Sequence, residues 1–342
     1  MIDKSKEPSG KRTLLKWLCI TAGIVLIAAV GIGLYADSLM NQIHYVDPEV
    51  MPTLSQQELN RIQQAETVPN RTAANPSARQ KKAYVPIVKE DAVVNILLIG
   101  QDRRSGEKRA RSDAMILCTF NTSNQTLTLT SFLRDLWVQI PGYQDNKLNA
   151  AYVAGGMKLL NETLEHNFGI HIDGNVEVDF NQFVQIVDLL GGVEIALRAD
   201  EARYINRALG IKELSAGVQT LSGKQALCYC RIRSLDRDAD FSRTNRQRNM
   251  IDAMVTKYRN AGITTALSLL NDILPMMTTD MTKKQLIGYA YQILPMLPSA
   301  QIISQRIPAD GTFTTPVIRN MSVLLADMDA ARKMLKQTLE SN

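Results

Sequence analysis

The chain has few of the residues on which most metal-binding and nucleophilic motifs depend. Its 342 residues include three histidines and four cysteines. His44, His166 and His171 do not have metal-ligand spacing, and the cysteines contain no CxxC pair. GxSxG and GxxxxGK[ST] sequences are also absent. The sequence therefore lacks the essential parts of a zinc site, a serine hydrolase of the nucleophile-elbow type and a P-loop protein.

The overall charge is positive but does not select a partner. Lysine and arginine number 39 against 34 acids, which gives a net charge of +5 and a pI near 8.9. Such a balance suits nucleic acid, an anionic membrane or a phosphorylated polymer. The length exceeds the ~100 to 200 residues typical of one domain, so we expect one large globular domain with additional segments.

One long hydrophobic run lies near the N-terminus. Residues 17–36 carry no charge over 20 positions, and five lysines and arginines precede them. About 20 apolar residues cross the ~30 Å of a bilayer core as a helix, and flanking cations favour the cytoplasmic side. A cleaved signal peptide, the alternative, has a shorter apolar core of ~7 to 15 residues. We expect a cytoplasmic N-terminus at 1–16, a transmembrane anchor at 17–36 and an extracytoplasmic remainder in a single-pass cell-membrane protein.

The region after the anchor changes composition. Residues 37–91 contain five prolines and many Gln, Asn, Thr and Ala, and only about 56–66 looks helical. We interpret 37–91 as an extracytoplasmic stalk. The folded domain is then predicted to occupy 92–342, with no linker inside it.

The pattern of the folded region is typical of a layered α/β domain. A near-continuous apolar run that ends in glycine, residues 93–100, predicts a buried central strand. Further strands and helices alternate along the chain, which favours strands and helices packed in layers. The other predicted strands are 114–120, 126–131, 193–197 and 301–307, and the predicted helices include 156–167, 180–190, 264–276, 282–297 and 327–340.

Acidic residues lie at the ends of the first two predicted strands. Asp102 follows the first strand and Asp113 begins the second. Two carboxylates at neighbouring strand ends suit Mg²⁺, which takes one or two carboxylates and fills its other positions with water and phosphate oxygens. Either aspartate alone fits an ion pair with a nearby arginine equally well. Arg134 and Asp135 follow the third strand, and we expect them at the same edge of the sheet.

A second basic segment follows near residue 231. Six arginines and no lysine occur from Arg231 to Arg248. Guanidinium groups bind phosphate oxygens in a bidentate geometry that an ammonium group cannot reproduce. Arg243 and Arg246 would lie in the first turn of a helix capped by Asp240 or Ser242, where an anion would be favoured. A surface network of these arginines with Asp236, Asp238 and Asp240 is the alternative, and this segment does not separate the two.

With these segments in view, the chain resembles the LytR-CpsA-Psr family of cell-wall polymer ligases. The resemblance spans roughly residues 93 to 260, in one order and spacing. The motifs that carry it are LLIG-x-D (97–102), RSD (111–113), SFLRD (131–135), IPG (140–142), KLNAAYVAGG (147–156), VDF (178–180), VDLLGGV (187–193), LSGKQALCYCRIR (221–233) and DFSRTNRQR (240–248).

The resemblance implies a fold and a reaction. The fold would be a three-layer α/β/α domain with a mixed central sheet. The enzyme would be an extracytoplasmic phosphotransferase, moving a glycopolymer such as teichoic acid or capsule from a polyprenyl-pyrophosphate carrier to peptidoglycan. The acceptor would be the C6 hydroxyl of N-acetylmuramic acid, and the product a phosphodiester.

The resemblance also implies a site. Mg²⁺ would be held by Asp102 and Asp113. Arg111, Arg134 and Arg243 would act in catalysis, with Asp135 as a candidate base. The predicted pyrophosphate ligands are Arg111, Arg134, Arg231, Arg233, Arg243 and Gln247.

Two other functions would use much of this site. A pyrophosphatase would release the polymer to water, whereas a non-catalytic binder would keep the arginines without needing both Asp102 and Asp113. A DNA-binding regulator is disfavoured because an exported domain does not meet DNA, so we expect no nucleic acid partner. The carried polymer is not specified, since different glycans present the same pyrophosphate.

Overall fold

The computed structural model divides the chain into two units, residues 1–43 and 44–342. It describes residues 35, 37–48, 53–64, 86–87, 90–101, 112–236, 239–259, 268–269 and 271–340. Within those ranges no helix is long and apolar enough to cross a membrane. The predicted anchor lies outside the described residues except for Tyr35, so the transmembrane prediction is not tested. The second unit contains the features below.

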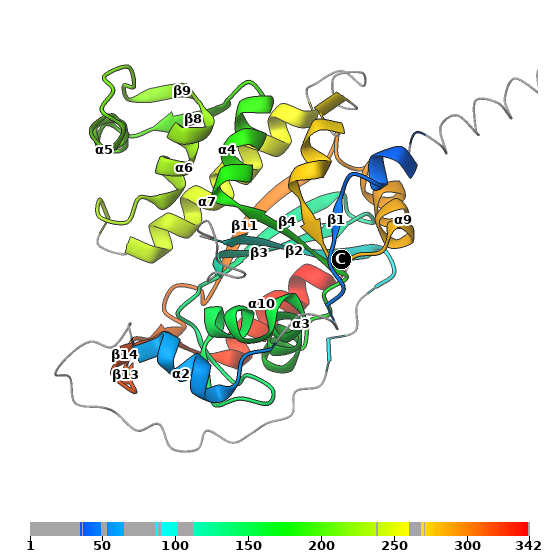
Figure 1. Ribbon diagram of the computed structural model, residues 1–342, viewed down its shortest axis with the longest axis vertical. Coiled ribbons are helices and arrows are strands. Elements are labelled where there is room, and N and C mark those ends of the chain that lie inside the picture. The colour runs from blue at the N-terminus through cyan, green and yellow to red at the C-terminus, as the bar shows by residue number, and fades with distance from the viewer. Residues whose placement is uncertain are drawn as a thin grey trace, which may run out of the picture. The chain divides into compact units, whose positions relative to one another are not determined.

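A seven-stranded mixed sheet forms the centre of the second unit (Figure 1). Its strand order is β1-β10-β7-β2-β3-β4-β11. β2 runs parallel to β7 and antiparallel to β3, β3 and β4 form an antiparallel hairpin, and β11 is parallel to β4. The carboxyl ends of β2, β4, β7 and β11 and the start of β3 therefore meet at one edge. The strands are β1 (His44–Tyr45), β2 (Val93–Gln101), β3 (Ser112–Asn121), β4 (Thr126–Phe132), β7 (Gly174–Asp179), β10 (Thr278–Thr279) and β11 (Gln301–Ile307).

Helices cover both faces of this sheet because its strands bury apolar side chains on both. In β2, Leu97 and Ile99 belong to one hydrophobic cluster, whereas Val94 and Ile96 belong to another. Since side chains alternate along a strand, the two sets face opposite layers. Helices α2 (Gln56–Gln64), α3 (Leu148–Phe168) and α10 (Met328–Leu339) contribute to the first cluster, and α7 (Ala239–Arg259) and α9 (Lys283–Ile293) cover the other face. The predicted α/β architecture with a mixed central sheet is confirmed.

A smaller hydrophobic cluster lies beside the sheet. Val187 and Leu221 are fully buried in it, and Met250 of α7 joins it. The hairpin of β8 and β9 packs with three helices there, and Figure 1 shows these elements along one side of α7. The elements are α4 (Phe180–Leu189), β8 (Val193–Leu197), α5 (Ala199–Leu209), β9 (Gly217–Leu221) and α6 (Gly223–Arg231).

Short pairings complete the fold. β12 pairs with β15, β13 with β14 and β5 with β6, all antiparallel. Their bounds, with those of the 3-10 helix η1, are β5 (Trp137–Val138), β6 (Asn146–Lys147), η1 (Leu274–Met276), β12 (Phe313–Thr314), β13 (Val317–Ile318), β14 (Met321–Ser322) and β15 (Leu325–Ala326).

The structure differs from the sequence prediction at several boundaries. Helix α3 begins at Leu148, eight residues before the predicted start, because the helix continues across a kink at Gly155 and Gly156. Helix α7 begins at Ala239, so Arg243 and Arg246 lie in its second turn and not its first. The predictions contained neither β7, α5 nor β9. In the range predicted as a stalk, β1 joins the central sheet and α2 contributes the buried Leu59 to the main cluster.

The close approach of α4 and α6 gives a stability prediction. A Cβ on Gly223 would lie 2.1 Å from the carbonyl oxygen of Val184 and 2.8 Å from its Cα, so backbone would have to move. Gly223→Ala should lower the free energy of unfolding by about 1 to 3 kcal/mol. Gly288 in α9 has no atom within 4 Å of the same position, so Gly288→Ala should raise it by about 0.5 to 1 kcal/mol. Urea unfolding followed by circular dichroism measures both. Equal effects of the two substitutions would contradict the close packing.

Candidate functional site

The sheet edge described above brings together side chains from four segments. Asp113 is the second residue of β3, and Arg134 and Asp135 follow the end of β4. Arg233 follows α6, and the first two turns of α7 contribute Asp240 and Arg243. Backbone bonding fixes the β4 end, because the Leu133 amide donates to Ile307 at the end of β11 (3.0 Å). The predicted meeting of these strand ends is what the structure shows.

Arg134 lies at the centre of this group. Its Nη1 donates to Oδ1 of Asp113 at 2.8 Å, and its Nε lies 3.8 Å from Asp135 and 3.8 Å from Asp240. Burial alone would lower the pKa of Arg134, but the charges of Asp135, Asp240 and Asp113 raise it above its ordinary value. The guanidinium is therefore fixed in place and permanently charged.

Asp240 contacts three arginines, one after β4, one after α6 and one in its own helix α7. Its carboxylate oxygens lie 3.4 Å from Nη2 of Arg243, 3.5 Å from Nε of Arg233 and 3.8 Å from Nε of Arg134. Arg233 also approaches Asp113 at 4.0 Å. We call Arg134, Arg233 and Arg243 the arginine cluster. Three guanidinium groups around one carboxylate provide more donors than that carboxylate can accept.

Arg243 is the most buried member of the cluster. Its side chain is 3% exposed, yet its Nε and Nη1 have no hydrogen-bond partner among the described residues. Gln247 lies one turn further along α7, and its buried Oε1 also has none. Buried polar atoms are usually hydrogen-bonded, so the unpaired donors of Arg243 suit an anionic ligand.

Asp135 and Asp240 form a carboxylate pair with opposite pKa shifts. For Asp240, burial outweighs the attraction of Arg134 and Arg233, and with the charge of Asp135 it raises the pKa. For Asp135, burial acts in the same direction, but the Lys147 ammonium at 2.8 Å, the charge of Arg134 and a hydrogen bond with Asp240 together outweigh it and lower the pKa. Two carboxylates whose pKa values are driven apart are typical of acid–base sites. Asp240 is the member suited to exchange a proton.

The sequence analysis gave no role to two buried charged residues near the strand ends, Lys147 and Glu177. Lys147 is mostly buried and ion-paired with Asp135. Glu177 of β7 is buried and accepts hydrogen bonds from Tyr152 and Gln101. Lys147 does open the KLNAAYVAGG motif, so that motif was an available signal. For Glu177 no signal existed, because β7 itself was not predicted.

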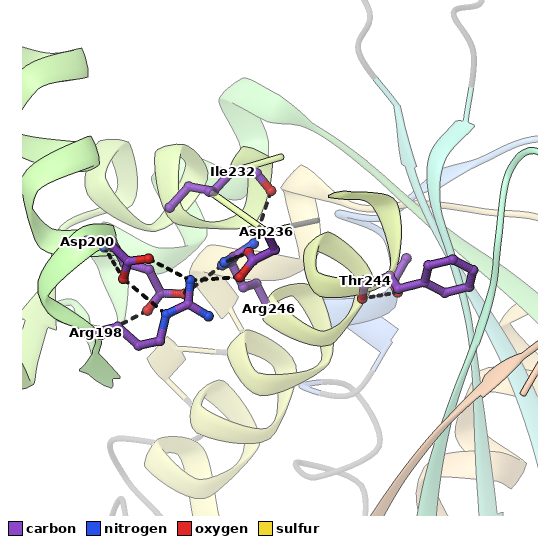
Figure 2. A network of polar contacts seen from close by, with 8 residues as sticks. Arg198, Asp200, Ile232, Asp236, Thr244 and Arg246 are labelled. Atoms are coloured by element: carbon purple, nitrogen blue, oxygen red, sulfur yellow. Dashed lines mark hydrogen bonds and ion pairs between the residues drawn. The ribbon is translucent and has the colours of Figure 1, made fainter. Parts of the chain in front are cut away.

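Arg246 does not belong to the arginine cluster, because its guanidinium has other partners. Its Nε donates to Glu201 at 2.7 Å, its Nη1 donates to the Ile232 carbonyl at 3.2 Å, and its Nη2 donates to Asp236. Figure 2 shows this network, in which Arg198 also contacts Asp236. Arg246 therefore takes the ion-pair alternative of the sequence analysis, whereas Arg243 faces the site. The network fixes residues 232–236, which carry Arg233.

The remaining predicted residues differ in what can be said of them. Arg231 ends α6, with its guanidinium 4.7 Å from the ring centroid of Phe180. Asp102 and Arg111 lie outside the described residues. Among the described residues, no group of three or more His, Cys, Asp or Glu could hold a metal ion.

Asp113 is the predicted Mg²⁺ ligand that lies among the described residues. The shortest contacts that Arg134 and Arg233 make with Asp113 both go to its Oδ1, at 2.8 and 4.0 Å. Because Mg²⁺ needs only one or two carboxylates when phosphate oxygens complete its shell, a carboxylate beside an anion site fits this ion.

Comparison with known proteins identifies the family. The LytR_cpsA_psr family model matches residues 58–340, so the chain belongs to this family. The polyisoprenyl-teichoic acid–peptidoglycan teichoic acid transferase TagT of Bacillus subtilis is 28% identical over 312 residues, which cover 89% of this chain and 88% of that protein. Regulatory protein MsrR of Staphylococcus aureus is 34% identical over 175 residues, about half of each chain (51% and 51%).

Solved structures of the family share the fold. TagT bound to LIIa-WTA superposes with a TM-score of 0.60 at 25% identity, covering 80% of this chain and 96% of that one. The LytR-CPS2A-psr family protein YwtF (TagT) with bound octaprenyl pyrophosphate lipid gives 0.57 at 27% identity, covering 77% and 98%. The mixed sheet is therefore the fold of this family.

Proposed function

We propose that this protein is a phosphotransferase that moves a glycopolymer from a polyprenyl-pyrophosphate carrier to a hydroxyl of peptidoglycan. The observation that carries the proposal is the buried Arg243, whose unpaired donors lie beside Arg134 and Arg233. The proposal is supported by similarity to a transferase of teichoic acid and to a family structure that holds octaprenyl pyrophosphate. The acceptor we propose is the C6 hydroxyl of N-acetylmuramic acid.

The reaction needs charge neutralisation more than covalent help from the protein. The acceptor oxygen attacks the phosphorus that bears the glycan, the bond from that phosphorus to the bridging oxygen breaks, and polyprenyl phosphate leaves. Arg134, Arg233 and Arg243 would bind the pyrophosphate oxygens and stabilise the charge that develops on the leaving group. Arg111, Arg231 and Gln247 stay predicted ligands of the same anion.

A metal ion and a base complete the proposed site. Asp113, with Asp102, would hold Mg²⁺, which when bound neutralises phosphate charge. The acceptor hydroxyl must lose a proton. Asp135 was the predicted base, but its ion pair with Lys147 stabilises its ionised form and weakens it as a proton acceptor. Asp240, with a raised pKa, fits that role better.

The pH dependence of the rate distinguishes the two aspartates. Protonation of Asp240 would remove the base, so kcat/KM should fall as pH falls, with an apparent pKa above the ~3.9 of an ordinary aspartate. Asp135→Asn removes a neighbouring negative charge, so the acid limb should move to lower pH in the remaining activity. If Asp135 were the base, its substitution would instead abolish the limb. A pH profile of kcat/KM for the wild type and this variant decides between them.

The test of the proposed function uses the full chain with a polyprenyl-pyrophosphate glycan, a peptidoglycan oligomer and Mg²⁺, with products identified by mass. We expect a glycan–phosphate–oligomer product that Asp113→Ala and Arg134→Ala abolish. Reactions without the oligomer, in ¹⁸O-water, detect a pyrophosphatase, because hydrolysis would place ¹⁸O on the released glycan phosphate. Lipid binding without either product would show a non-catalytic binder and overturn the proposal.

We also propose a location in the cell membrane, with residues 17–36 as the anchor and the catalytic domain outside. The uncharged run and the cations before it support this topology. Protease treatment of intact cells should degrade the domain while sparing residues 1–16. Protection of the domain in intact cells would refute the topology.

A further inference from the structure

Two arginines outside the arginine cluster lie close together between α7 and β11. Arg248 of α7 is 4% exposed, and its Nε and Nη1 have no hydrogen-bond partner among the described residues. Its Nη2 makes one long contact, 3.3 Å to Oδ1 of Asn245. Arg306 of β11 has an unpaired buried Nε, and its guanidinium lies 4.4 Å from the ring centroid of Phe241. The pair therefore presents several open donors in a buried place.

Only one of these two cations has an acidic partner among the described residues. Arg306 contacts Asp310, whose side chain is 88% exposed, but Arg248 has no ion pair in the described part of the chain. Burial, with the positive charge of Arg306, lowers the pKa of Arg248 to about 10. A buried cation that faces a second cation is costly unless an anion accompanies it.

A third polar group faces the same space. Ser131 of β4 is the ladder partner of Arg306, and its buried Oγ has no hydrogen-bond partner among the described residues. Leu127 and Leu129 precede it on the same face, and they pack against Ile251 of α7. The Ser131 hydroxyl is therefore on the α7 side of the sheet.

We propose that Arg248, Arg306 and Ser131 form a second anion site that binds a phosphate monoester or diester. This site is separate from the arginine cluster, because Arg248 follows Arg243 by five residues and so projects about 140° away around α7. Its phosphate could come from the carrier lipid or from the polymer. The proposal concerns binding alone and stands without the proposed transfer reaction.

Calorimetric titration of the full chain with inorganic phosphate tests this site. We expect two bound anions per chain, falling to one in Arg248→Met and one in Arg243→Met. Arg203→Met, on the exposed surface of α5, should keep two. An unchanged stoichiometry in Arg248→Met would overturn the proposal.

Thermal stability provides a second test. The sign of the change in melting temperature in Arg248→Met distinguishes an anion-binding arginine from one that only supports the fold. Without phosphate, Arg248→Met should melt at a higher temperature than the wild type, because a buried unbalanced charge is removed. Phosphate should stabilise the wild type more than the variant, since ligands stabilise the state that they bind. A variant that is less stable without phosphate, yet equally stabilised by it, would contradict the site.

The source of the phosphate follows from two probes, geranyl phosphate and glycerol 3-phosphate, titrated into Arg243→Met. If adding Arg248→Met abolishes binding of geranyl phosphate, the site binds the lipid head group. If it abolishes binding of glycerol 3-phosphate, the site binds the polymer. If neither ester shows such a loss, the proposal fails.

Helix α9 independently presents apolar side chains on two opposite faces. The outward side chains of Ile287, Tyr291 and the C-cap residue Leu294 are 49%, 83% and 49% exposed, at helical spacing. No charged residue occurs from 285 to 305, and two lysines precede that stretch. The inward face packs on the sheet through Leu286, Tyr289 and Ile293.

We infer that this outer face of α9 contacts an anionic membrane surface. β1 pairs with β10, which ends four residues before α9, so residue 44 is fixed near the start of this helix. The apolar run 17–36 ends eight residues before His44, at most about 29 Å of extended chain. Apolar side chains beside lysines are typical of helices that lie in a membrane interface. The inference rests on the proposed anchor, and its test does not require turnover.

Brominated lipids test this contact. In the full chain reconstituted with brominated phosphatidylglycerol, Tyr291→Trp should add emission, relative to the wild type, that the lipid quenches. Val218→Trp, at a position 67% exposed in the β8–β9 hairpin, should add emission that is not quenched. Equal emission from Tyr291→Trp with and without bromine would overturn the inference. The same result is expected if a second copy of the protein covers α9, so that outcome also counts against membrane contact.

Discussion

Arg243→Lys should reduce kcat/KM for polymer transfer by about 10³-fold or more, although the positive charge is retained. The arginine is almost completely buried, with one donor toward Asp240 and two donors open. Lysine cannot reproduce a planar fork that contacts a carboxylate and two phosphate oxygens together. Initial rates with saturating acceptor and varied lipid-linked donor measure the effect.

The matched control is Arg203→Lys on the exposed surface of α5, which should leave the rate unchanged. Thermal unfolding of both variants shows whether the chain remains folded. If folded Arg243→Lys kept a tenth or more of the wild-type rate, Arg243 would act as a simple positive charge, and the bidentate role would be wrong.

The sheet edge could be predicted from the sequence because strand ends are marked locally. The predicted strands ended at Gly100 and Ser131, and Asp102 and Arg134 followed them within three residues. Once the strands were placed, their antiparallel pairing brought Asp113 next to Arg134, as the 2.8 Å contact shows. Here residues adjacent to a strand in sequence remain adjacent to it in space.

The roles within the arginine segment could not be predicted in this way. Arg243 and Arg246 are three residues apart on one helix, and their faces differ by about 60°. That rotation places one against Asp240 and the other against Glu201 of α5. Because α5 was absent from the predicted elements, the sequence could not indicate that Glu201 forms an ion pair with Arg246. Lys147 differs, because the motif that it opens was a signal, whereas its contact with Asp135 depends on tertiary packing.

Arg246→Met should lower the free energy of unfolding by about 3 to 5 kcal/mol, because it leaves Glu201 buried without its cation. Both side chains of this ion pair are nearly inaccessible, at 3% and 5% exposed. The double variant Glu201→Leu/Arg246→Met removes both charges and should recover most of that loss. Arg198→Met, in the same network but with a half-exposed side chain, should cost less than about 1 kcal/mol. Urea unfolding of the four chains measures these differences.

The double variant should nevertheless transfer polymer slowly. Arg246 also holds the Ile232 carbonyl and Asp236, and the apolar replacements restore neither bond (Figure 2). Residues 232–236 would then lose the constraint that directs Arg233 toward Asp240, so kcat should fall while the stability stays near that of the wild type. If the double variant recovered stability and rate together, Arg246 would serve packing alone. Recovered stability with a low rate would instead show that the buried network positions an arginine of the site, as its contacts indicate.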